Sequence, residues 1–170
     1  MIVYDNQFNG NEWSVIIGLS IGIIVVYLLP KRFPKQIATV FFLCGVFTGF
    51  FFDHTLSVQP VSFYDVNDVS LFEVMDFVSY WMYGPFSYLF FYAYEHFRVK
   101  PSFIPIYILI WSLIGMGMEG VAAILGIFHY TNGYKFWYSF LVYLLVQSLW
   151  MILYYRFRGR WQGEPGKQPQ

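Results

Sequence analysis

Hydrophobic residues gather in five long stretches of the chain, and short polar segments separate them. The stretches run approximately over 13–29, 37–52, 77–94, 104–128 and 136–155. Each comes close to the ~20 residues that an α-helix needs to cross a hydrocarbon core ~30 Å thick. The pattern predicts an all-α fold, namely a polytopic integral membrane protein with five transmembrane helices.

Composition supports a single membrane domain. Of the 170 residues, 58% are hydrophobic and 12% are charged, about half the ~25% charged residues of soluble proteins. We expect a single domain over 1–158, surrounded by the lipid bilayer. The tail over 159–170 has no apolar pattern, and we expect it to be disordered and cytoplasmic. No basic patch with interleaved aromatic residues points to nucleic acid.

The charges between the stretches give the predicted bundle a direction. Nine of the ten Lys and Arg residues fall on one side of it, in 31–35, in 98–100 and after 155, and only Lys135 falls on the other. Short loops rich in Lys and Arg stay in the cytoplasm. We therefore expect the N-terminus outside and the C-terminus inside the cell.

Small residues recur at helical spacing on several of these stretches. Such residues let helices approach closely in lipid, where packing and interhelical hydrogen bonds replace the hydrophobic drive. We predict helix contacts at Ser14, Gly18, Gly22, Gly45, Gly49 and Gly115. The ridge on the first stretch would also suit a helix of another chain, so a membrane-protein partner or a homo-oligomer stays open.

Polar residues recur at the same spacing and predict a polar cleft that opens to the outside. Its candidate residues are Asp53, Asp76, Tyr80, Tyr83, Glu119, Tyr143 and Gln147. Glu119 stands out because a carboxylate near the centre of a bilayer costs several kcal/mol, by insertion scales about 2.5–3.5. It is either a functional group or a neutral structural acid that is hydrogen-bonded to Gln147 or Tyr143.

The acidic segment over 53–76 is a candidate source of metal ligands. Within it, Ser70 and Glu73 have the spacing of a capping box, so we expect the third helix to begin near Ser70. His54 and His129 fall on the same side of the predicted membrane, and His/carboxylate sets suit zinc or iron. Because no HExxH or paired-His motif accompanies them, we expect no metal and no cofactor, with these two histidines as the candidates if a metal binds.

The C-terminal half carries a recognisable pattern. Glu119 is followed by Gly-Ile-Phe-His-Tyr-Thr-Asn-Gly-Tyr over 126–134 and then by Tyr138-Ser139. With Asp76 and the segment 101–111, this resembles a family of small multi-pass membrane proteins of spore-forming, Bacillus-like Firmicutes. The resemblance covers roughly 70–158, with Asp53 as an outlier further upstream. It implies a five-helix bundle in a bacterial plasma membrane and no activity, since none is established for that family.

Three classes of function remain open at this point. A non-enzymatic accessory, sensor or assembly component is the first, because no nucleophile–base set and no cofactor motif is present. A small proton-linked carrier or channel that uses Glu119 is the second. An intramembrane metal-dependent enzyme is the third.

Overall fold

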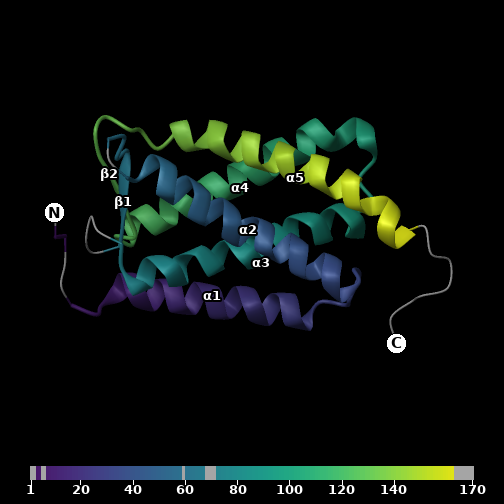
Figure 1. Cartoon of the computed structure of the whole chain (residues 1–170), viewed down its shortest axis with the longest axis horizontal. Coiled ribbons are helices and arrows are strands. Elements are labelled where there is room, and N and C mark those ends of the chain that lie inside the picture. The colour runs from purple at the N-terminus through teal and green to yellow at the C-terminus, as the bar shows by residue number, and fades with distance from the viewer. Residues whose placement is uncertain (1–2, 5–6, 59, 68–71, 163–170) are drawn as a thin grey trace.

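The structure is a computed structural model that describes residues 3–4, 7–58, 60–67 and 72–162 (Figure 1). Within these residues the chain forms five long helices, one short 3₁₀ turn at Pro101–Phe103 and a small sheet. The helices are α1 Gly10–Leu28, α2 Lys35–Leu56, α3 Val74–His96, α4 Ile104–Ile124 and α5 Tyr138–Gln162. The strands are β1 Tyr64–Val66 and β2 Phe128–Tyr130.

Length and composition suit four of these helices to a membrane. They are α1, α2, α4 together with its leading 3₁₀ turn, and α5 up to Gly159. The remaining long helix, α3, has 23 residues but contains many Tyr and Ser residues and one Asp. It is also the helix with the most buried positions. The expectation of a helical protein with membrane-type helices is confirmed at this level.

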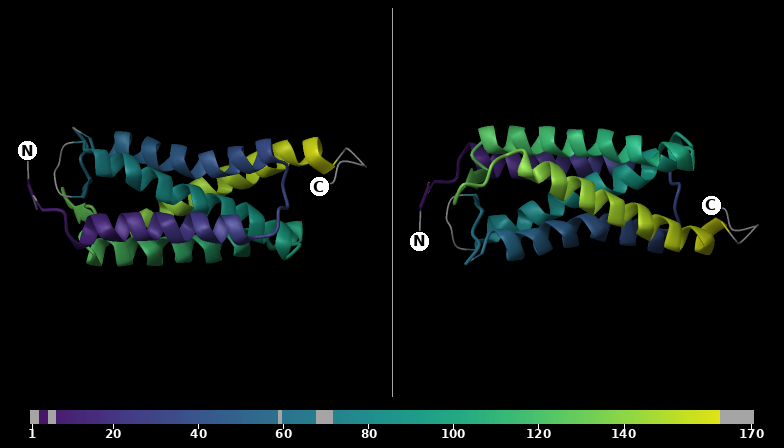
Figure 2. Two further views of the ribbon diagram at one scale, coloured as in Figure 1. Left: turned by 90° about the horizontal axis from the view of Figure 1, so that it is seen from below. Right: turned by 90° about the horizontal axis from the view of Figure 1, so that it is seen from above.

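The helices lie along one long axis and leave two different ends (Figures 1 and 2). The sheet and the N-terminal segment lie at one end, which we call the sheet end. The α1–α2 and α3–α4 connections and the end of α5 lie at the other, which we call the turn end. Helix α3 packs against both α1 and α2, while α4 packs against α5.

Close contacts between helices occur where α2 and α1 present glycine to α3. A Cβ atom at Gly45 would lie 1.9 Å from the Tyr83 carbonyl oxygen, and one at Gly49 would lie 2.5 Å from the Tyr83 ring. The close approach lets Ser87 donate a hydrogen bond to the Phe41 carbonyl (2.7 Å) and accept one from the Gly45 amide (3.0 Å). Such bonds hold helices together in lipid.

The other predicted contact residues have different neighbours. Gly18 and Gly22 of α1 lie against Met82 and Pro85 of α3, so their face is covered within the same chain. Gly115 of α4 faces the Tyr143 ring. Ser14 turns its hydroxyl to the Gly10 carbonyl of its own helix.

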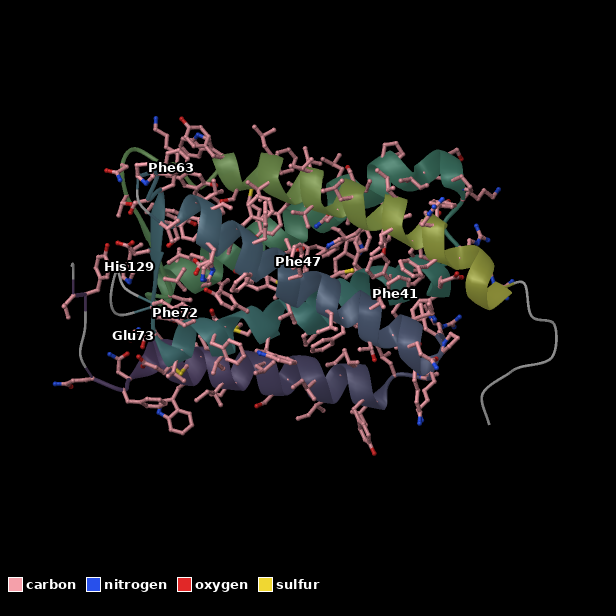
Figure 3. All side chains as sticks on the ribbon, viewed as in Figure 1. Phe41, Phe47, Phe63, Phe72, Glu73 and His129 are labelled. Carbon is pink, nitrogen blue, oxygen red and sulfur yellow. The ribbon has the colours of Figure 1, made fainter. Side chains whose placement is uncertain are left out.

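A large aromatic cluster fills the bundle toward the turn end. Phe41 stacks on Phe91 with ring centroids 3.9 Å apart, and Phe90 packs edge-on against Trp150. Both Phe41 and Phe91 are fully buried. Figure 3 shows Phe41 on the turn-end half of α2, whereas Phe63, Phe72, Glu73 and His129 gather at the sheet end.

The sheet corrects the all-α prediction. Strands β1 and β2 pair antiparallel, with Tyr64 opposite Tyr130 and Val66 opposite Phe128. Helix α4 therefore ends at Ile124 instead of continuing to Phe128. Gly126, at φ +78°, makes the turn into β2, a backbone conformation that suits glycine. The sheet joins the α2–α3 connection to the α4–α5 connection.

Helix ends differ from the expected positions for local reasons. Helix α3 begins at Val74, because Glu73 and Asp76 form its capping box; Ser70 lies outside the described residues. Helix α1 begins earlier than expected, with Asn9 and Glu12 as its capping box. Helix α5 continues to Gln162, so the expected disorder from Gly159 is wrong for 159–162, and the rest of the predicted tail lies outside the described residues.

Candidate functional site

Glu119 lies toward the sheet end of α4 and is held by hydroxyl groups. Its Oε1 accepts hydrogen bonds from the Tyr130 hydroxyl (2.7 Å) and from the Ser139 hydroxyl (2.5 Å). The Tyr134 hydroxyl lies 3.0 Å from Ser139 Oγ. Because Ser139 gives its one proton to Glu119, Tyr134 donates this third bond. Strand β2 and the start of α5 thus supply the polar partners that a carboxyl in a membrane helix requires.

Tyr130 acts as a donor in this cluster. It lies in β2, outside the long helices. Burial, together with its hydrogen bond to Glu119, raises the pKa of Tyr130, so the hydroxyl stays protonated.

A cavity lies beside Glu119 between α2 and α5, and we call it the α2–α5 cavity. Its volume, taken as the space open to the centre of a water molecule, is about 80 Å³. One water needs only ~10–15 Å³ on this measure, so the cavity is large enough for a small molecule. Its wall bears the polar groups of Thr48, Glu119, Ser139 and Gln147. Its aromatic wall consists of Phe52, Tyr64, Tyr83, Phe86, Phe128, Tyr130, Tyr134, Tyr143 and Trp150.

Gln147 is the polar group of this wall with unused hydrogen-bonding capacity. It is fully buried, and its Oε1 accepts a hydrogen bond from the Ser112 hydroxyl (3.0 Å). Its Nε2 has no hydrogen-bond partner. A buried donor left without a partner costs about 1–3 kcal/mol. The residue therefore brings an unpaired N–H donor to the side of the bundle that lines this cavity.

A second cavity lies between α3 and α4, and we call it the α3–α4 cavity. It measures about 90 Å³ on the same scale. Most of its wall is apolar and includes Val66, Met82, Met118, Ala122 and Ile127. The two cavities share five wall residues, which are Tyr83, Phe86, Glu119, Phe128 and Tyr143. Glu119 thus lies where the two cavities adjoin.

The structure brings four of the predicted cleft residues together. Tyr83, Glu119, Tyr143 and Gln147 all line the α2–α5 cavity. The expected hydrogen bond between Glu119 and Gln147 is not formed: Gln147 Oε1 accepts from Ser112, and Gln147 Nε2 has no partner. The Tyr143 hydroxyl interacts with the Glu119 carboxyl, as expected for a neighbouring tyrosine.

The other three predicted cleft residues line neither cavity. Tyr80 donates a hydrogen bond to Asp53 at the sheet end of α2. Asp76 accepts hydrogen bonds from Asn67 Nδ2 (2.6 Å) and from the Glu73 amide (2.7 Å), which fixes the start of α3. Asp76 lies at a helix N-terminus, where backbone N–H groups stabilise a carboxylate, whereas Asp53 lies in the last turn of α2 and is held by the Tyr80 hydroxyl.

The two histidines have separate aromatic neighbours. His54 stacks on Phe50 and contacts its carbonyl oxygen (3.0 Å). His129 stacks on Tyr4, with ring centroids 3.8 Å apart. Over residues 3–4, 7–58, 60–67 and 72–162, no three His, Cys, Asp or Glu side chains come close enough to hold a metal ion.

Sequence reasoning did not identify the partners of Glu119. Tyr130 lies in the segment between the fourth and fifth apolar stretches and Ser139 lies in the fifth stretch, so helical spacing relates neither of them to Glu119. Both reach Glu119 because the chain turns at Gly126 and returns through β2. Gly126, near the end of the fourth apolar stretch, was the one available signal in the sequence, because glycine suits a turn.

Comparison of the chain with protein-family models, with curated proteins and with solved structures gives no match. The site is therefore interpreted from its own geometry.

Proposed function

We propose that the protein is a non-enzymatic accessory or sensor protein of the bacterial plasma membrane that binds a small molecule in the α2–α5 cavity. In this proposal all five helices cross the bilayer, with the sheet end outside and the turn end in the cytoplasm. The resemblance to the Bacillus-like membrane family and the bias of Lys and Arg toward the turn end support the membrane and the orientation.

One observation carries the binding role, namely an unpartnered donor at a cavity of suitable size. Gln147 is fully buried, its Nε2 has no partner, and the wall around it also bears the Glu119 carboxyl. Binding pockets typically combine apolar and aromatic walls with a few placed polar groups. A bound molecule that accepts from Gln147 would remove the cost of the unpaired donor.

Thiol labelling tests whether the cavity takes up small molecules from the outer aqueous phase. In a Cys44→Ala background, Val142→Cys places a thiol on the wall of the α2–α5 cavity. The neighbouring Leu141→Cys is the matched control, because Leu141 is 67% exposed on the bundle surface, where lipid would cover it. The reagent is a small, charged methanethiosulfonate that is added outside intact cells.

We expect rapid modification of Val142→Cys and slow modification of Leu141→Cys. Equal and slow modification of both would overturn an outward-opening binding cavity. Rapid modification of Leu141→Cys would overturn the membrane placement of α5.

A proton-linked carrier is the second candidate, and the position of Glu119 favours it. The residue borders both cavities, and hydroxyl groups of β2 and α5 surround it. A carboxyl group that lines an internal cavity is a common feature of proton relays in transporters. This candidate predicts flux that depends on Glu119, whereas a sensor or accessory protein needs none.

A further inference from the structure

The polarity of the two cavities changes across their shared wall. The α2–α5 cavity offers hydrogen-bonding groups from Glu119, Ser139 and Gln147. The α3–α4 cavity offers methyl, thioether and ring carbon atoms from residues such as Met82, Met118 and Ile127. A molecule that occupies both must therefore have a polar end and an apolar end.

The charged residues on the cavity walls restrict the charge of the molecule's polar end. No Lys, Arg or His lines either cavity in the part of the chain that the structure describes, and Glu119 is the one Asp or Glu residue on both walls. An anionic head such as a carboxylate or phosphate would meet no compensating cation, and burial of an unpaired charge is costly. The head is therefore not anionic.

Hydrogen bonding restricts the head further. Gln147 Nε2 needs an acceptor, and Glu119 Oε2 retains lone pairs, since the Tyr130 and Ser139 hydroxyl groups both donate to Oε1. A protonated amine has donors but no acceptor, whereas a hydroxyl group both donates and accepts. A hydroxyl group can therefore satisfy Gln147, and a second hydroxyl group can donate to Glu119.

We propose that the ligand of this site is an amphipathic lipid with an uncharged, hydroxyl-bearing head, such as a long-chain alcohol or a monoacylglycerol. Its head lies in the α2–α5 cavity between Glu119 and Gln147, and its hydrocarbon chain lies in the α3–α4 cavity. The proposal rests on the binding role proposed above and gives that role a ligand class.

Photocrosslinking tests the proposal on the full chain in phosphatidylcholine nanodiscs. The probe is a long-chain primary alcohol with a diazirine in its chain, and the matched probe is the corresponding carboxylic acid. Labelled residues are identified by peptide mass spectrometry. We expect saturable labelling of α3 and α4 at the α3–α4 cavity, with the alcohol preferred over the acid by roughly tenfold, the effect of one unmatched buried polar group.

Three variants locate the two ends of the bound molecule. Gln147→Met removes the free donor at nearly constant length, and we expect it to weaken alcohol labelling by roughly tenfold. Ala122→Phe fills the α3–α4 cavity, and we expect it to abolish saturable labelling. The control Val121→Phe, at a position 57% exposed beside it, should label as the wild type does.

Equal labelling by the acid probe, or wild-type labelling of Gln147→Met, would overturn the assignment of the head group. Labelling that does not saturate and spreads over exposed faces of α1 and α5 would overturn the lipid site itself. If Val142→Cys is labelled from outside while no alcohol crosslink saturates, the ligand class is wrong and the binding cavity stands. Saturable crosslinking together with an unreactive Val142→Cys would instead overturn the outward opening and retain the lipid site.

Discussion

At the scale of single residues, Glu119 shows what a sequence can and cannot reveal about a polar site in an apolar helix. Glu119 could be predicted as a site residue from the sequence alone, because a carboxylate inside an apolar helix is costly. Its partners Tyr130 and Ser139 could not be selected in the same way, because one lies in a strand and the other one helix away. Spacing along a helix identifies residues on one face but does not place residues that return through a turn.

Substitution of Glu119 distinguishes a functional role of its carboxyl from the role of a neutral structural acid. Glu119→Gln keeps Oε1 as an acceptor for Tyr130 and Ser139, so we expect a change in unfolding free energy below about 1 kcal/mol. Glu119→Leu leaves both hydroxyl groups without their acceptor, and we expect a loss of about 1–3 kcal/mol. Thermal unfolding of the purified variants in one detergent, repeated as pH is varied, measures both effects.

Measurement of pH-linked flux in vesicles that contain the wild type or Glu119→Gln completes the comparison of these variants. The carrier candidate requires that Glu119→Gln stays folded and loses a pH-linked flux. A wild-type protein without such flux, or a Glu119→Gln variant that retains it, would exclude the carrier role of this residue.

At the scale of elements, the contact between α2 and α3 is the tightest that the glycines make. Gly45 brings the two backbones together, and the Ser87 hydroxyl bonds to α2 at this position. The small-residue pattern pointed to Gly45 and Gly49, and the structure places both against Tyr83. The predicted helix at 77–94 corresponds to α3, although its Tyr and Ser content reflects burial in the bundle more than contact with lipid.

An alanine at Gly45 should separate these helices. Its Cβ would lie 1.9 Å from a backbone oxygen of α3 and 2.5 Å from Ser87 Oγ. We expect Gly45→Ala to destabilise the protein by about 1–3 kcal/mol, the usual cost of overpacking. Gly117→Ala is the control, because no atom lies within 4 Å of its added Cβ, and it should stabilise α4 by up to about 1 kcal/mol. Equal unfolding midpoints for the two variants would contradict this account of the α2–α3 contact.

The sheet was the element that the sequence analysis missed. Each strand has three residues, too few for an alternating pattern to be recognised. The partners also lie far apart in the chain, with Asp65 opposite His129. Pairing of this kind follows from the packed helices that bring two loops together, and no local pattern records it.

At the scale of the whole molecule, the number of crossings is the property that remains to be measured. Four helices are apolar enough to span a bilayer by hydropathy, while α3 has the length but a more polar composition. If α3 crosses as well, the α1–α2 and α3–α4 connections lie on one side of the membrane. If it does not, they lie on opposite sides, and the bundle of Figure 1, which has both connections at its turn end, would not form in the membrane.

Three single-cysteine variants, again in a Cys44→Ala background, test whether α3 crosses the membrane. We expect Lys135→Cys to react with a membrane-impermeant maleimide on intact cells. Lys31→Cys and Lys100→Cys should react only after permeabilisation, because the positive side stays in the cytoplasm. Opposite behaviour of Lys31→Cys and Lys100→Cys would show that α3 does not cross. Reversal of all three would invert the orientation.

The pairing of β1 with β2 also sets an order for biosynthesis. During synthesis β1 has no partner until late, because β2 follows α4 in the chain. Glu119 is likewise synthesised before Tyr130 and Ser139. If α4 inserts into a bilayer as it is made, its carboxyl enters without these two hydroxyl groups. A nascent chain truncated before β2 would keep an unpaired strand and a carboxyl that lacks both hydrogen bonds.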